Sequence, residues 1–163
     1  MIGDPSEYPA DLENQGQRQV DHSVMLIQLI YVSSAKQELS DAELDKILES
    51  SSHHNAGQQV TGMLLYSFGN FMQVLEGPAE AVDAAYNRIC ADPRHHHIFL
   101  LSREEISERH FEKWHMGFHR VTRLDADAHP AFAPLFANGF NAEQLGAKAG
   151  QAMELLTLFR DNN

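Results

Sequence analysis

The chain has 163 residues, with 12 Lys and Arg side chains against 23 Asp and Glu, so its formal net charge is −11. This length predicts one domain with a substantial core, and the charge argues against a general nucleic-acid or anionic-membrane surface. A single cysteine, Cys90, excludes an intramolecular disulfide. No signal peptide, membrane-spanning apolar run or lipidation motif is found, so we expect a cytoplasmic location.

The chain begins with a polar stretch, residues 1–22, which is rich in Asp, Glu, Gln, Asn and Pro and which we expect to be a flexible leader. The run Met25–Ser33 is too short and too β-branched for a helix, and its near-continuous hydrophobicity predicts a central strand. Tyr31 shares one face of this strand with Leu29. A buried tyrosine hydroxyl normally finds a hydrogen-bond partner, and Gln73 on another strand is one candidate.

A helix is expected to begin after Ser40, because Ser40 and Glu43 form a capping box flanked by the hydrophobic staple of Leu39 and Leu44. Gly57 is placed to close this helix. The inward stripe changes from hydrocarbon to polar groups along its length, in the order Leu44, Ile47, Leu48, Ser51, His54 and Asn55. This change indicates a polar ligand between helix and sheet, although periodicity leaves open a last turn that is polar because it is exposed.

A hairpin is predicted over Thr61–Glu76, with its turn at residues 67–70. Its second arm carries Gln73 in the middle of an apolar strand, on the same face as Phe71 and Leu75. A buried amide without partners costs about 2–7 kcal/mol, so Gln73 needs hydrogen bonds. Backbone groups or a neighbouring hydroxyl would satisfy it as well as a ligand would.

A second helix is expected to open at Gly77–Pro78, with Pro78 at the first helical position, and to end at Asp92–Pro93. A buried strand at 98–101 and a last strand at 111–118 should follow. The last strand would place Trp114 and Met116 on one face.

These elements predict an α+β fold with a ferredoxin-like βαββαβ core, an additional fifth strand and two helices on one face of the sheet. Two C-terminal helices, one at 129–137 and a longer one that begins after Asn141, are expected to cap the other face or to meet a partner subunit. The predicted organisation is therefore a leader (1–22), a core domain (23–121) and a helical tail (122–163).

Motifs of common enzymes are absent: the sequence has no phosphate loop, dinucleotide fingerprint, metalloprotease signature or nucleophile elbow. No three of its ten histidines converge in the predicted elements, so we expect no metal site. Most carboxylates lie on predicted solvent faces, which gives no support to a catalytic pair.

Six segments in order resemble the BLUF domain, a blue-light sensor that uses flavin. They are Leu29–Ser33, Ser51–Asn55, Thr61–Tyr66, Phe71–Gly77, Ile89 with Asp92–His95, and Arg109–Gly117. Their spacing is similar to that of the family from about Val24 to about Val121, and their combination is specific to it.

The resemblance implies a non-covalently held flavin, usually FAD, with FMN and riboflavin as the other options. It makes Tyr31 the photoactive electron donor and Gln73 the amide that switches between that tyrosine and the flavin. The remaining implied cofactor contacts are Ile47, Ser51, His54, Asn55, Arg88, Ile89, Asp92 and Arg94. Trp114 and Met116 match the last-strand pair to which signal output is attributed.

The implied function is a blue-light photoreceptor and not an enzyme, in which rotation or tautomerisation of Gln73 shifts the flavin absorption to the red. Because only a helical tail follows the core, the chain is similar to short BLUF proteins, and we expect it to self-associate and to signal to a protein partner. Two alternatives remain open. One is a small flavin-dependent oxidoreductase, and the other is a flavin-free ferredoxin-like interaction domain in which Tyr31, Gln73 and Asn55 are satisfied core residues.

Overall fold

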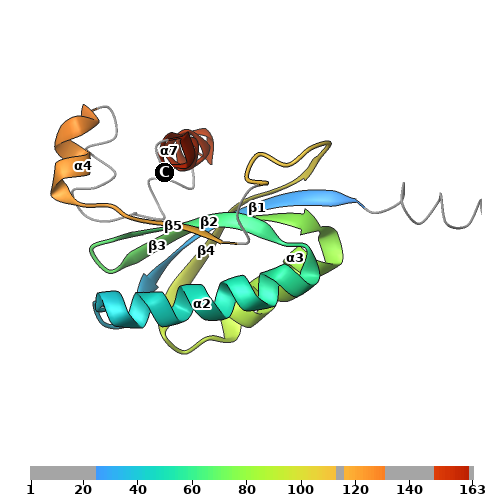
Figure 1. Cartoon of the computed structure of the whole chain (residues 1–163), viewed down its shortest axis with the longest axis horizontal. Coiled ribbons are helices and arrows are strands. Elements are labelled where there is room, and N and C mark those ends of the chain that lie inside the picture. The colour runs from blue at the N-terminus through green and yellow to red at the C-terminus, as the bar shows by residue number, and fades with distance from the viewer. Residues whose placement is uncertain (1–24, 113–115, 131–148, 162–163) are drawn as a thin grey trace, which may run out of the picture.

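The computed structural model describes residues 25–112, 116–130 and 149–161, which form a mixed five-stranded sheet with helices on both faces (Figure 1). The strand order is β4-β1-β3-β2-β5; only the β2–β5 pair is parallel. The predicted α+β architecture, a ferredoxin-like core with a fifth strand, is confirmed. The elements are β1 (Leu26–Ala35), α2 (Asp41–Gln58), β2 (Thr61–Ser67), β3 (Asn70–Pro78), α3 (Ala79–Ala91), β4 (His95–Ile106), β5 (Gly117–Arg120), α4 (Arg123–Ala128) and α7 (Ala149–Asp161).

Strands β1 and β3 form the centre of the sheet and are buried along most of their length. They pair antiparallel in a register that sets Tyr31 directly opposite Gln73. Because side chains alternate along a strand, directly opposed residues lie on the same face of the sheet. The register of the two central strands therefore brings the phenol and the amide together.

The β2–β3 hairpin closes with the two-residue turn Phe68-Gly69, whose φ angles are 47° and 82°. Two consecutive positive φ angles define the type I′ geometry that matches the twist of a hairpin. Glycine adopts such angles without steric cost, whereas phenylalanine does so only under the constraint of the hairpin.

Helix α2 begins as the sequence predicts, because the Ser40 hydroxyl accepts a hydrogen bond from the Glu43 backbone N–H at 3.2 Å. Its predicted end is wrong by two residues. Gly57 lies inside the helix, and Gln59 (φ 59°) takes the left-handed position that closes it. The Gln59 carbonyl is held by the Arg109 guanidinium at 2.6 Å, which helps to stabilise this position.

Helix α3 starts one residue later than predicted, so that Pro78 is its N-cap and not its first helical residue. Its last helical residue is Ala91, and Asp92 is its C-cap, as expected from the Asp92–Pro93 stop. Helices α2 and α3 cover the same face of the sheet (Figure 1), in a core that includes Leu29, Leu44, Leu64, Leu75 and Val82. This confirms the prediction of two helices on one side.

The opposite face of the sheet is covered by α7 (Figure 1), whose Ala152, Leu155, Leu156 and Phe159 are buried against it. Full burial of a leucine or phenylalanine side chain contributes about 1.5–3 kcal/mol, so these contacts hold α7 firmly. The prediction that a tail helix caps this face is confirmed for α7. The other predicted tail helix, 129–137, lies mostly outside the described residues, and the short helix α4 before it was not predicted.

Two strand predictions need correction. The run 98–101 belongs to β4, which is an edge strand and not a buried one, so that Phe99 and Leu100 remain about half exposed. The last strand is β5, which begins at Gly117 and not at Phe111. Phe111 is fully buried, but its backbone N–H donates to the Glu76 carboxylate and does not enter the sheet ladder. Trp114 lies outside the described residues.

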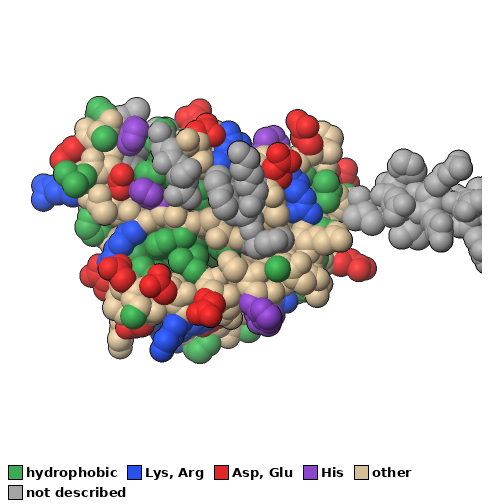
Figure 2. Space-filling model, viewed as in Figure 1, with side chains coloured by type: hydrophobic (Ala, Val, Ile, Leu, Met, Phe, Trp, Pro, Cys, Tyr) green, Lys and Arg blue, Asp and Glu red, His purple; other side chains and the backbone are tan. Residues whose placement is uncertain are grey.

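Within the described ranges, no helix combines the length and hydrophobicity needed to cross a membrane. On the face shown in Figure 2, acidic and basic side chains are interspersed and the described residues form no large basic patch.

Candidate functional site

A cleft lies between α2 and α3 over the sheet face that carries Tyr31 and Gln73. It consists of two adjoining hollows with cavity volumes of about 70 and 170 Å³. Every residue predicted to contact a cofactor lines at least one of them: Ile47, Ser51, His54, Asn55, Gln73, Arg88, Ile89, Asp92 and Arg94. Tyr31 lines the first hollow.

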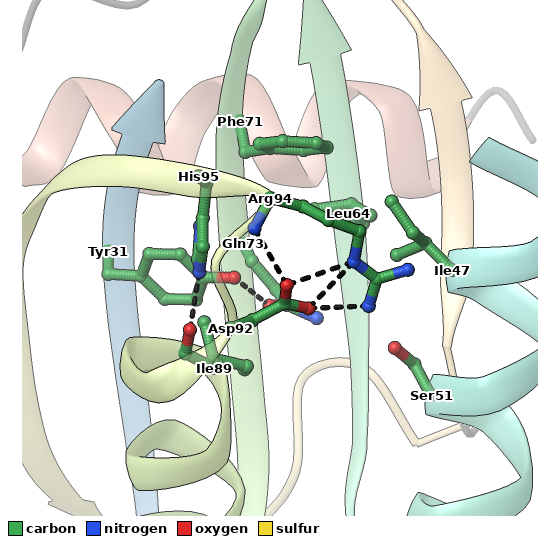
Figure 3. A pocket seen from close by; sticks show the side chains of 10 residues that line it. All are labelled: Tyr31, Ile47, Ser51, Leu64, Phe71, Gln73, Ile89, Asp92, Arg94 and His95. Carbon is green, nitrogen blue, oxygen red and sulfur yellow. Dashed lines mark hydrogen bonds and ion pairs between the residues drawn. The ribbon is translucent and has the colours of Figure 1, made fainter. Parts of the chain in front are cut away.

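The innermost polar group is the pair of Tyr31 and Gln73, each only 3% exposed. The Tyr31 hydroxyl donates to the Gln73 side-chain oxygen, and the Gln73 amide nitrogen donates to the Met116 sulfur at 3.1 Å (Figure 3 shows the tyrosine and glutamine). A thioether is a weak acceptor. Within the described residues, the amide N–H groups of Gln73 therefore have no strong acceptor and retain the capacity to donate to a polar ligand.

The environment of Tyr31 keeps its phenol protonated. Burial raises the pKa of Tyr31 well above its ordinary value, and the neighbouring Tyr86 and Cys90 raise it further. The Tyr86 ring lies 5.6 Å from that of Tyr31, between centroids, and burial followed by the contact with Cys90 raises the pKa of Tyr86 to about 12. Tyr31 is thus a neutral hydrogen-bond donor throughout the physiological pH range.

An ion pair between Asp92 and Arg94 lies at the cleft, between Ile47 of α2 and Ile89 of α3, in front of Gln73 (Figure 3). The Arg94 guanidinium, by hydrogen bonding, holds the pKa of Asp92 below its ordinary range. The Arg94 side chain is half exposed. Its Nε and Nη2 donate to Asp92, so Nη1 is the nitrogen placed to donate to an anionic group.

His95 connects the end of α3 to strand β1. One ring nitrogen, Nε2, contacts the Ile89 carbonyl oxygen, and because a carbonyl only accepts, Nε2 carries the proton. The other, Nδ1, lies 2.9 Å from the Ser33 hydroxyl. These contacts fix Ile89 relative to the sheet and so help to set the width of the cleft.

Several lining residues were not predicted as site residues: Ser50, Leu64, Phe71, Leu75, Ala85 and His95. Strand alternation already placed Phe71 and Leu75 on the face of Gln73, and the hairpin register sets Leu64 opposite Gln73. These three residues could therefore have been predicted as lining residues from the sequence. Contacts of the His95 ring with α3 and β1 depend on tertiary packing, which sequence spacing does not carry.

The two residues predicted for signal output differ in outcome. Met116 lies against Gln73, as described above, and is 9% exposed. Trp114 falls outside the described part of the chain, so its role stays a prediction. No group of three His, Cys, Asp or Glu side chains able to hold a metal occurs among the residues that the structure describes.

A cleft with isoleucine side chains on opposite walls and a few convergent polar groups, among them the Gln73 amide and the Arg88 and Arg94 cations, is typical of a small-molecule binding site. The family model described as sensors of blue light using FAD matches residues 26–117, more than half of the chain. The chain therefore belongs to the BLUF family, and it is a member of a class of blue-light sensors that bind flavin.

Characterised relatives share this domain. The chain is 39% identical over 84 residues to photoactivated adenylate cyclase subunit beta of Euglena gracilis, which is 52% of this chain and 10% of that protein. It is 36% identical over 89 residues to the blue light- and temperature-regulated antirepressor BluF of Escherichia coli, or 55% of this chain and 22% of that protein. It thus matches less than a quarter of the length of either relative.

The fold is also similar to a solved structure, the dark state of BlrB, a BLUF protein. The TM-score is 0.63 at 30% sequence identity, and the match covers 79% of this chain and 95% of that one.

The described residues fit a flavin. The N–H groups of the buried Gln73 amide, which among the described residues bond only the Met116 sulfur, could donate to the polar edge of an isoalloxazine. Ile47 and Ile89 lie on opposite sides of the cleft (Figure 3). Arg88 and Arg94 supply cations for a phosphate-bearing tail. When bound, the flavin supplies absorption of blue light and transient oxidising power.

Proposed function

We propose that this protein is a blue-light photoreceptor whose switch is the Tyr31–Gln73 pair, that FAD is its flavin, and that it signals by binding a protein partner without catalysing a reaction. The observation that carries this proposal is the buried contact from the Tyr31 hydroxyl to the Gln73 carbonyl, at the base of the cleft. The two alternatives, an oxidoreductase and a flavin-free interaction domain, assign no task to this pair.

Gln73 is suited to switching because the two ends of its carboxamide, the accepting oxygen and the donating nitrogen, have different partners. In the present arrangement the oxygen end meets Tyr31 and the nitrogen end meets Met116. Rotation by half a turn would exchange the positions of these ends, whereas tautomerisation would exchange their donor and acceptor roles without moving the two atoms. Tyr31 supplies a phenolic proton at the atom where that exchange begins.

The free-energy difference between the two arrangements is small. A hydrogen bond contributes a net of about 0.5–1.5 kcal/mol, so the rearrangement of two such bonds changes the free energy by about 1–3 kcal/mol. Because no covalent bond to the protein is formed, the rearranged state can relax in the dark. A small difference suffices to bias an output element only if that element is itself nearly balanced between two states.

FAD is favoured over riboflavin because the cleft has cationic side chains at its rim, where a phosphate-bearing tail would lie. FMN would use the same cations. Binding of FAD, FMN and riboflavin to the purified protein, measured by fluorescence quenching, tests this order.

The acidic net charge favours a protein partner over nucleic acid or an anionic membrane. We also propose self-association and a cytoplasmic location, with residues 23–121 as the sensor and 122–163 as the output segment.

Absorption spectra recorded before and after blue light test the switch. The flavin-loaded protein should shift reversibly to the red, and Gln73→Leu should keep the flavin but lose the shift. Gln28→Leu is a matched control, because Gln28 is a buried amide on the opposite face of the sheet that bonds Glu76. A Gln73→Leu protein with an unchanged photocycle refutes the assignment, and steady oxidation of NADH by the pure protein would favour an oxidoreductase.

A further inference from the structure

The last turn of α7 contacts two segments of the chain that lie on either side of Met116 in sequence. The Phe159 ring stacks on the imidazole of His119 in β5, with centroids 4.1 Å apart and planes inclined by 21°. The next residue, Arg160, donates from Nη1 to the His110 carbonyl at 2.9 Å, and its guanidinium lies 5.5 Å from the centre of the Phe111 ring.

The segment 109–111 is anchored to the sheet by a buried carboxylate. Glu76 is fully buried and accepts hydrogen bonds from the backbone N–H groups of His110 at 2.8 Å and Phe111 at 2.7 Å. The side chain of Gln28, directly opposite Glu76 on β1, donates to the same carboxylate at 2.8 Å. A buried carboxylate that accepts several hydrogen bonds is costly to release, so this segment is held rigidly.

Arg109 adds a second anchor at the same end of the sheet. Its guanidinium donates to the Thr61 hydroxyl at 2.8 Å and to the carbonyl oxygens of Glu76 and Gln59 at 3.0 and 2.6 Å. The 109–111 segment is therefore tied to β2, to β3 and to the end of α2.

The other contact of α7, between Phe159 and His119, leads to strand β5 and not to the 109–111 segment. His119 pairs with Leu65 in the parallel β2–β5 ladder, and it donates from Nε2 to Asp125 of α4 at 3.1 Å. It follows Met116 by three residues, whereas Phe111 precedes Met116 by five. Movement of Met116 would therefore reach β5 and His119 directly, while the carboxylate of Glu76 holds the other segment in place.

We propose that Phe159 and Arg160 are the residues through which the sensor acts on α7: Phe159 follows β5 through His119, while Arg160 is held by the fixed 109–111 segment. This inference rests on the proposed switch at Gln73. Ala152, Leu155 and Leu156 anchor the preceding turns in the core. The light-dependent change is therefore confined to the last turn of α7, residues 157–161, and the helix stays on the sheet.

The test is hydrogen exchange of the full flavin-loaded chain in the dark and under continuous blue light, with absorption recorded on the same samples. Amides of the last turn of α7 should exchange at rates that differ by about tenfold between the two conditions, the equivalent of one net hydrogen bond. Phe159→Leu and Arg160→Met should each keep the red shift and reduce this difference to less than about twofold, and Arg160→Lys should restore it because an ammonium also donates to the His110 carbonyl.

Glu154→Gln, an exposed position on the same helix, is the matched control and should behave as the parent protein. Arg160 is partly exposed whereas Phe159 is buried in the core, so Arg160→Met should fold even if Phe159→Leu does not. The inference is overturned if the parent protein shows the red shift without a change at residues 157–161, or if Arg160→Met retains the full change. Absence of the red shift in the parent protein would instead refute the proposed function.

Discussion

Removal of the Tyr31 hydroxyl tests the centre of the mechanism. Tyr31→Phe keeps the ring and its packing but takes away the donor to Gln73. Because Gln73 is 3% exposed, its carbonyl oxygen would be left buried without this partner, and an unsatisfied buried polar group costs about 1–3 kcal/mol. For a protein of this size, each kcal/mol lowers the melting temperature by about 2–4 °C.

We expect Tyr31→Phe to bind flavin, to lose about 1–3 kcal/mol of unfolding free energy, and to show no reversible red shift. Urea unfolding measures the first effect and light-minus-dark difference spectra the second. Tyr66→Phe is the matched control. Tyr66 is a fully buried tyrosine in the core under α2 and α3, its hydroxyl accepts from the Leu39 backbone N–H at 3.0 Å, and it does not line the cleft.

The Tyr66→Phe protein should lose comparable stability and keep the red shift. A normal photocycle in Tyr31→Phe would contradict the reasoning. Loss of the photocycle in both variants would show that any damage to this core abolishes it, and the special role of Tyr31 would then be unsupported.

Alkaline titration gives an independent readout of the same hydroxyl. Since burial raises the pKa of folded Tyr31 above its ordinary value of 10.0, the unfolded chain loses this proton first. The contribution to stability is fully present below pH 10.0 and is lost as pH rises toward the folded pKa. Tyr31→Phe should show a weaker loss of stability above that pH than the parent protein.

Four further outcomes are expected. Arg94→Ala should weaken FAD binding by about 10- to 100-fold, the equivalent of one charge-assisted hydrogen bond, and riboflavin binding much less. Arg103→Ala, which breaks a surface ion pair with Asp83 outside the cleft, should change neither affinity, and equal losses for both flavins would refute a phosphate contact. Arg94 lowers the pKa of Asp92, so the contribution of this ion pair to stability should be present above pH 3.8 and be lost as pH falls through the lowered pKa. An acid unfolding curve that Asp92→Asn leaves unchanged would contradict this expectation. Removal of flavin should lower the free energy of unfolding by about 2.7 kcal/mol, relative to protein in a free flavin concentration of 100 times the dissociation constant. Calorimetry measures this difference. Leu156→Ala should cost about 2–5 kcal/mol in urea unfolding, whereas a cost below 1 kcal/mol would show that α7 is only loosely held.

Local signals in the sequence predicted the early elements well. The Ser40 capping box, the alternation around Gln73 and the Asp92–Pro93 stop each depend on neighbours in sequence, and all three are confirmed. Predictions failed where tertiary contacts decide. Gly57 is the better left-handed residue by intrinsic preference, but the Gln59 carbonyl is bound by Arg109, fifty residues away in sequence.

The apolar run 98–101 shows a second limit of sequence patterns. Continuous hydrophobicity predicted a buried strand, yet β4 lies at the edge of the sheet. A hydrophobic pattern contains no information on the order of strands in the sheet, so the position of β4 at the edge could not be predicted from it. Likewise, Phe111 is apolar enough for a strand, and only the distant Glu76 explains why its backbone does not join one.

The register of β3 has a consequence for how this domain tolerates insertions and deletions. A shift of one residue would replace Gln73 by Met72 or Val74 opposite Tyr31, and would drive a carboxamide into the hydrocarbon layer beneath α7. A register shift in β3 would therefore abolish the light response and destabilise the fold at the same time. Homologues should therefore be free of gaps across residues 61–78, while length variation collects elsewhere.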